Sequence, residues 1–150
     1  RLTRTEPHLA RKPRLRIIKD DPMNMLKSYQ PYLLSLLRAV TGLVLFSYGT
    51  QKLLGFPASD AMPAAGSLPW IAGVLELILG FLVLIGLWTR VSAFVLSGLM
   101  AFAYFIAHAP QGFYPAQNGG VAAILFSFIF LYLAAAGSGP AGLDARRAQV

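Results

Sequence analysis

Scarcity of charge after residue 27 is the sequence feature that most constrains this fold. Between Ser28 and Val150 only eight side chains are charged: Arg38, Lys52, Asp60, Glu76, Arg90, Asp144, Arg146 and Arg147. Soluble domains are typically about 25% charged, whereas this whole chain is 13% charged and 56% hydrophobic. A segment so long and so apolar has too little polar surface to cover a water-soluble globule. The sequence therefore predicts a protein embedded in a lipid bilayer.

Four apolar stretches, at about residues 31–54, 68–88, 91–109 and 119–136, are candidates for membrane spans. A helix needs about 20 residues to cross a hydrocarbon core about 30 Å thick. Loops rich in Gly and Pro, GFPASDAMPAAGS and APQGFYPAQNGG, separate the first two stretches and the last two. A tight turn near Trp88–Thr89–Arg90 joins the second to the third. We therefore expect an all-α, integral membrane four-helix bundle over residues 23–150.

The N-terminal residues 1–22 differ sharply from the rest of the chain. They read RLTRTEPHLARKPRLRIIKDDP, which is basic and lacks apolar runs. Such a composition cannot bury enough surface to fold, so we expect a disordered tail. The natural start is expected at Met23 or Met25. A transit peptide is the alternative, but Glu6, Asp20 and Asp21 argue against it.

Basic residues outside the spans indicate how the chain crosses the membrane. With four spans, Lys27, Arg90, Arg146 and Arg147 fall on one side, and the other side receives only Asp60. Short cytoplasmic segments carry the excess of Lys and Arg. We therefore expect a multi-pass protein of the bacterial inner membrane with both termini in the cytoplasm.

Ionisable residues within three of the spans are the candidate functional residues. Helical geometry places Arg38 and Lys52 on one face of the first span and Glu76 on a glycine-bearing face of the second. Counted from the expected span ends, Arg38 is offset from Glu76 by about 8 Å and Lys52 by about 13 Å. We therefore predict a buried Arg38–Glu76 ion pair.

A second candidate site is an outer polar pocket, which could bind a quinone head group. It comprises Gln51, Lys52, Tyr104 and His108. Simpler roles remain open, because Lys52 could extend to the interface and His108 could serve only as an interfacial hydrogen-bonding residue.

Other chemistries are excluded or not expected. The chain has no cysteine, and its second histidine, His8, lies in the tail, so a bis-histidine haem within one bundle is excluded. No group of His, Asp and Glu has the spacing of a metal site, and no GxGxxG or P-loop occurs. The net charge of +7 lies in the tail and at helix ends. Nucleic acid is therefore not an expected partner.

Several of these features together resemble the DoxX family of small bacterial inner-membrane proteins. LLRAVTGLVLFSYGTQKLLGF resembles the family's first span, and IAGVLELILGFLVLIGLWTRVSA resembles its second span with the Thr-Arg turn. MAFAYFIAHAPQGFYPAQNGG and GSGPAGLDARR resemble its third span with the following loop and its Leu-Asp ending. The resemblance implies a four-helix membrane bundle, and part of the family is linked to oxidoreductase assemblies, including a quinone-reducing one.

Three functions are consistent with these residues and this resemblance. The first is a membrane subunit of an oxidoreductase system that contacts quinone and a soluble redox enzyme. In that case the chain would be at most one subunit of an enzyme assembly. The second is a non-catalytic membrane anchor or organising partner for other proteins. The third is a small proton-linked transporter or channel that uses Glu76. The sequence identifies no substrate.

Overall fold

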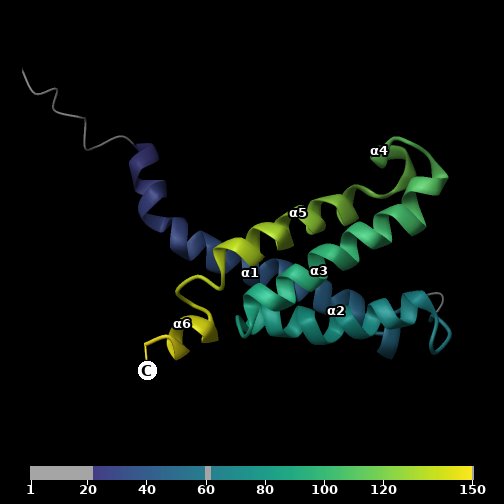
Figure 1. The fold of residues 1–150 in the computed structure, drawn as a ribbon, viewed down its shortest axis with the longest axis horizontal. Helices are drawn as coiled ribbons and strands as arrows, with labels where there is room; N and C mark the ends of the chain where they lie inside the picture. The colour runs from purple at the N-terminus through teal and green to yellow at the C-terminus, as the bar shows by residue number, and fades with distance from the viewer. Residues whose placement is uncertain (1–21, 60–61, 150) are drawn as a thin grey trace, which may run out of the picture.

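The structure, a computed structural model, describes residues 22–59 and 62–149. Its long helices are α1 (Pro22–Leu54), α2 (Leu68–Ile85), α3 (Thr89–Ala103) and α5 (Val121–Ala136) (Figure 1). Short elements are the π-helix η1 (Tyr104–His108), the 3-10 helix η2 (Ala109–Gln111), α4 (Pro115–Asn118) and α6 (Leu143–Arg147). The described residues contain no strand, which confirms the predicted all-α fold.

The long helices form two antiparallel pairs, α1 with α2 and α3 with α5, and α2 and α3 contact each other less extensively. The α2–α3 turn and residues 137–149 lie at one end of the bundle, which we call the turn end (Figure 1). Residues 55–59, 62–67 and 109–120 lie at the opposite end, which we call the loop end.

Helix α1 begins well before the apolar stretch at 31–54. Residues 22–30 read PMNMLKSYQ, and Met, Leu, Lys and Gln favour helix, while proline suits a first helical position. Pro31 lies inside the helix, and Figure 1 shows α1 bent in its N-terminal half. A proline removes one backbone hydrogen bond and commonly bends a helix without ending it. Residues 1–21, which hold nearly all of the predicted tail, lie outside the described residues.

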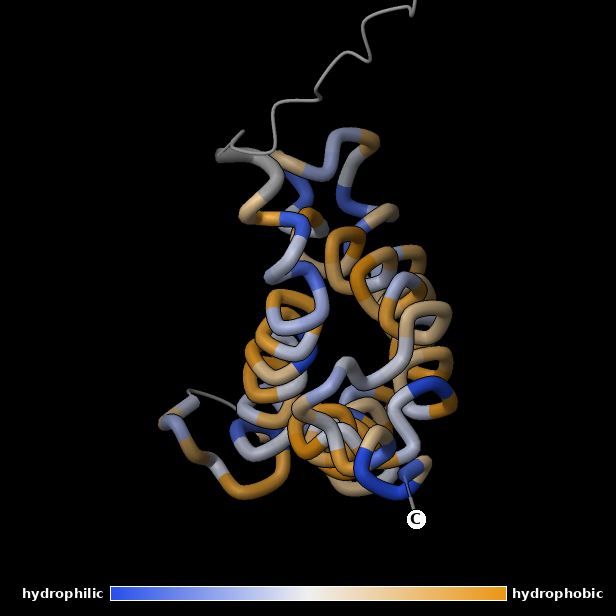
Figure 2. Tube along the Cα trace, turned by 90° about the vertical axis from the view of Figure 1, so that its left-hand side faces the viewer, coloured by the Kyte–Doolittle hydropathy of each residue, from blue (hydrophilic) through white to orange (hydrophobic). Residues whose placement is uncertain are grey.

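The outer surface of the bundle suits lipid. Three segments of the described chain, Met25–Leu54, Leu68–Ile85 and Thr89–Gln111, are long and apolar enough to cross a membrane. Helix α5 is equally apolar but has only 16 residues, a length of about 24 Å. Large apolar side chains such as Phe94 and Phe128 point outward, and Figure 2 shows this apolar character along the long helices. In water such exposure would be very unfavourable, which confirms a helical membrane bundle.

The buried core joins all four long helices. Leu45 of α1 and Val83 of α2 pack with Ala93, Leu96 and Met100 of α3 and with Phe130 and Leu133 of α5. Between α3 and α5, Ser97 and Ser127 exchange hydrogen bonds, each hydroxyl donating to the other's carbonyl, at 2.8 Å and 3.1 Å. Such interhelical bonds satisfy hydroxyls that lipid cannot.

Glycines fix the register of α1 against α2. A Cβ on Gly42 would collide with the backbone of Leu84, and one on Gly49 would collide with the backbone of Leu77. Small residues at such contacts let two helices approach closely. Helix α1 therefore packs on α2 in one defined axial position, which sets the height of every polar side chain between them.

Candidate functional site

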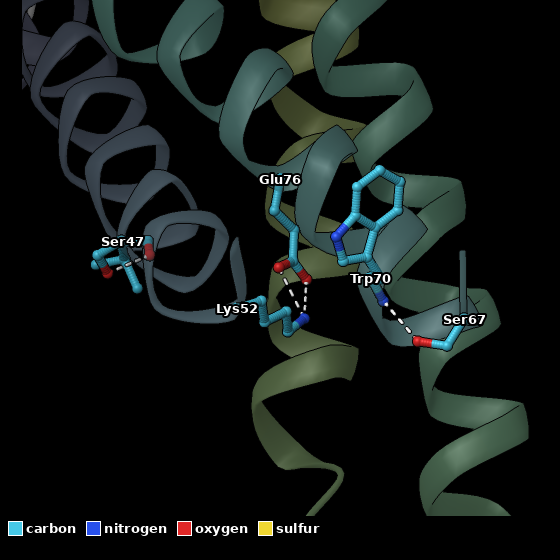
Figure 3. A network of polar contacts seen from close by, with 6 residues as sticks. Ser47, Lys52, Ser67, Trp70 and Glu76 are labelled. Atoms are coloured by element: carbon cyan, nitrogen blue, oxygen red, sulfur yellow. Dashed lines mark hydrogen bonds and ion pairs between the residues drawn. The ribbon is translucent and has the colours of Figure 1, made fainter. Parts of the chain in front are cut away.

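The candidate site is an ion pair between α1 and α2, in the half of the bundle nearer the loop end. Lys52 Nζ lies 2.7 Å from both carboxylate oxygens of Glu76 (Figure 3). The Glu76 side chain is only 4% exposed, whereas that of Lys52 is 30% exposed. The acid is thus enclosed by the bundle, and its basic partner extends from it toward the surface.

Register explains why Lys52, and not Arg38, pairs with Glu76. With Gly42 beside Leu84 and Gly49 beside Leu77, Glu76 lies level with Thr50. Lys52 is then about 3 Å away along the helix axis, and Arg38 is about 18 Å away. The predicted Arg38–Glu76 pair is therefore wrong, because the offsets were counted from expected span ends instead of from the glycine contacts.

Arg38 instead closes the C-terminal end of α2. Its Nη1 donates to the carbonyl of Val83 at 2.6 Å and to that of Leu84, and its Nε donates to the carbonyl of Ser138 at 2.9 Å. The last carbonyls of a helix have no partner within the helix and carry partial negative charge. Arg38 is 3% exposed, so it neutralises that helix end inside the bundle and also binds the C-terminal segment to it.

Asp144 performs the complementary task at the start of α3. Its two carboxylate oxygens each accept a 2.8 Å hydrogen bond from a backbone amide, one from Trp88 and one from Thr89. Trp88 has a left-handed φ of 48°, which this contact supports. Burial disfavours the charged carboxylate, but the hydrogen bonds from Thr89 and Trp88, with nearby Arg147, outweigh it and lower the pKa of Asp144.

The resembling motifs thus meet in space, although they are far apart in sequence. The Arg of the first span, the Thr-Arg turn and the Leu-Asp ending all lie at the turn end. Sequence reasoning assigned no role to Asp144 or Ser138. The available signals were the Leu-Asp ending shared with the family pattern and the scarcity of other acidic residues after residue 27.

At the loop end, His108 lies in the π-helix η1, and its ring is stacked with that of Tyr104 at a centroid distance of 6.5 Å. His108 Nδ1 is 3.0 Å from the carbonyl of Asn118. A carbonyl only accepts hydrogen bonds, so Nδ1 carries the proton and Nε2 of the neutral ring is an acceptor. The ring of Tyr104 packs directly over Gly120.

Asn118, a residue that sequence reasoning missed, organises this end. It is 4% exposed; its amide nitrogen donates to the carbonyl of Gly112, and its amide oxygen accepts from the backbone of Gly120, both at 2.8 Å. An Asn before two glycines is typical of such a turn, and this was the signal available in the sequence.

The predicted pocket of Gln51, Lys52, Tyr104 and His108 is divided between the two helix pairs. Gln51 and Lys52 are half-buried on α1, whereas Tyr104 and His108 belong to the α3–α5 side. Figure 1 shows the loop ends of the two pairs apart, so these four side chains do not form one cluster.

Comparison with known proteins shows which family the chain resembles. The sequence model of the DoxX family matches residues 33–109. A protein of Haemophilus influenzae described as uncharacterized is 43% identical over 128 residues, which cover 81% of this chain and 96% of that protein. No solved structure matches the chain. Because the family match spans half of the chain, including Arg38, Lys52, Glu76 and Arg90, the chain belongs to the DoxX family.

Proposed function

We propose that this chain is a membrane subunit of an oxidoreductase system and that Lys52 and Glu76 bind the head group of a membrane quinone. The observation that carries the proposal is a bundle-enclosed carboxylate paired with a partly exposed lysine between apolar helices. Charged side chains within a membrane are energetically unfavourable unless they are paired. Where they occur, they commonly mark substrate or proton paths.

The donor set suits a quinone. Lys52 has three N–H donors, and its two hydrogen bonds to Glu76 leave one that can be directed at a carbonyl oxygen. Conversion of a quinone to a quinol takes up two electrons and two protons. A reduced redox partner would supply the two electrons and water at the loop end the two protons, one of them relayed by the carboxylate of Glu76, while Lys52 orients the head group. Half-buried Gln51 adds an amide next to Lys52.

Tyr104 and His108 have a different part in this proposal. Because they lie on the other helix pair, they would not contact the same head group as Lys52. In this proposal their role is local to the loop end, where Nδ1 of His108 holds the carbonyl of Asn118.

The direct test is the quinone content of the purified full chain in native-lipid discs. We expect about one quinone per chain in the wild type and at least a tenfold loss in Lys52→Met, whose side chain keeps the length but not the donors. Arg146→Gln, an exposed change of the same charge on α6, is the matched control. Wild-type quinone content in folded Lys52→Met would contradict the proposal, as would its absence from the wild type.

Proton-linked transport is a second candidate, favoured by the burial of Glu76 inside the bundle. A carboxylate that alternates between a lysine partner and a bound proton could couple proton movement to that of a solute. Proton flux in proteoliposomes that is lost in Glu76→Gln would support it. If the wild type shows neither flux nor bound quinone, the remaining function is that of a membrane anchor for other proteins.

For the orientation, we propose that the turn end and both termini face the cytoplasm. The N-terminal part of α1, Arg90, Arg146 and Arg147 all lie toward that end of the bundle (Figure 1). Single cysteines test this without background, since the chain has none. Position 60 lies outside the described residues but belongs to the loop between α1 and α2. If a cysteine at that position reacted only from the cytoplasm, the proposed orientation would be wrong.

A further inference from the structure

The turn end contains an open cavity of about 550 Å³ that the proposed function does not use. It lies between the start of α3, the end of α5 and the C-terminal segment, and its lining includes Trp88, Arg90, Gly137, Asp144 and Ala148. Apolar and charged groups therefore meet at the position where two membrane helices end.

Arg90 presents an unused hydrogen-bonding edge in this cavity. Its Nη1 donates to the carbonyls of Ala134 and Ala135 at the end of α5. Among the residues that the structure describes, its Nε and Nη2 have no hydrogen-bond partner. These two atoms form the side of the guanidinium that binds a phosphate or carboxylate through two parallel hydrogen bonds.

Gly137 keeps that edge accessible. A Cβ at this position would lie 3.3 Å from Nη2 and 3.4 Å from Nε of Arg90, where a larger side chain would cover the edge. The φ of Gly137 is 89°, a conformation that favours glycine. The same residue thus ends α5 and leaves the guanidinium open.

The charged groups of the lining and the position of the cavity at the helix ends indicate the class of ligand. Asp144 is the acidic residue in the lining, and its two oxygens are engaged by the amides at the start of α3. Trp88, which is 64% exposed, and Val91, which is 69% exposed, both line the cavity. An exposed tryptophan at a helix end is typical of the head-group layer of a membrane, and an exposed valine suits acyl chains.

We propose that this cavity binds the phosphate of an anionic lipid, with Arg90 Nε and Nη2 donating to two phosphate oxygens and the acyl chains passing Val91. Basic sites at helix ends select anionic lipids by this kind of contact. The proposal is independent of the proposed function, because it concerns the opposite end of the bundle from Lys52 and Glu76.

Native mass spectrometry of the detergent-solubilised full chain, titrated with phosphatidylglycerol, phosphatidylcholine or inorganic phosphate, tests the proposal. We expect one tightly bound phosphatidylglycerol per chain and at least tenfold weaker binding of phosphatidylcholine. Arg90→Gln should weaken phosphatidylglycerol binding at least tenfold. The double variant Lys27→Gln/Arg146→Gln removes more charge from exposed positions outside the lining and should retain wild-type affinity.

Three results would overturn the proposal. Equal binding of phosphatidylglycerol and phosphatidylcholine would show that the cavity does not prefer an anionic lipid. Saturation by inorganic phosphate alone would identify a free anion as the ligand. An equal loss in the double variant would indicate general surface charge. If Arg90→Gln does not fold, Arg90→Lys decides: it keeps the charge but not the paired donors, so wild-type affinity there would also contradict the model of binding.

Discussion

The Lys52–Glu76 pair gives the sharpest test of the α1–α2 register. Changing Lys52 to Met leaves the carboxylate of Glu76, with its 4% exposed side chain, without its basic partner. Breaking one partner of a buried pair typically costs about 3–5 kcal/mol, whereas replacing both by apolar residues of similar volume is often close to neutral. We therefore expect each single variant, Lys52→Met and Glu76→Met, to lose about 3–5 kcal/mol. The double variant should lose far less than the sum.

The assay is reversible unfolding in mixed micelles, followed by circular dichroism across a double-mutant cycle. A parallel cycle with Arg38→Met and Glu76→Met is the matched control, because these two residues are separated by about 18 Å of helical rise. Residues that far apart give nearly additive losses. Additive losses for Lys52 with Glu76, or strong coupling of Arg38 with Glu76, would refute the register derived from the glycine contacts.

Three further outcomes follow from the packing and the helix ends. Gly49→Ala should destabilise the bundle by about 1–3 kcal/mol in the same assay, because its Cβ meets the backbone of Leu77; Gly98→Ala, with open space around it, should be neutral or stabilising. Asp144 has a lowered pKa in the folded chain, so its contribution is present above the ordinary aspartate pKa of about 3.9 and is lost as the pH falls through the folded value. Unfolding measured against pH should therefore show a smaller acid-dependent loss in Asp144→Asn. Arg38→Met should lower stability by about 3 kcal/mol or more because three carbonyls, two of them in buried hydrogen bonds, lose a charged donor; a near-neutral effect would contradict its capping role.

Much of the fold could be predicted from sequence because the lipid-facing helices are apolar over their whole length. Helical periodicity also placed Lys52 on a face of the first span and Glu76 on a glycine-bearing face of the second, and these two side chains meet between α1 and α2. Periodicity gives the angle of a side chain around its helix, but it does not give the axial offset between two helices. The paired glycines, 42 and 49 in α1 with 73 and 80 in α2, carried that information.

The candidate site was harder to predict because it depends on contacts between distant segments. The outer pocket was predicted from a common height near the loop end, yet Lys52 and His108 lie on helix pairs that diverge there. The divergence of the two helix pairs leaves no local pattern in the sequence of either pair. The capping of α3 by Asp144 depends on a contact across 55 positions, which one sequence alone does not reveal.

The charged caps at the turn end have a consequence for biogenesis. Arg38 needs the carbonyl of Ser138, and the start of α3 needs Asp144, yet both partners follow α5 in the chain. A ribosome makes the chain from its N-terminus, so all four long helices enter the membrane before these contacts can form. Until then Arg38 contacts only the end of α2, and its Nε and the first amides of α3 lack their partners. The contacts of the short segment after α5 therefore form in the last step of assembly, when they complete the turn end.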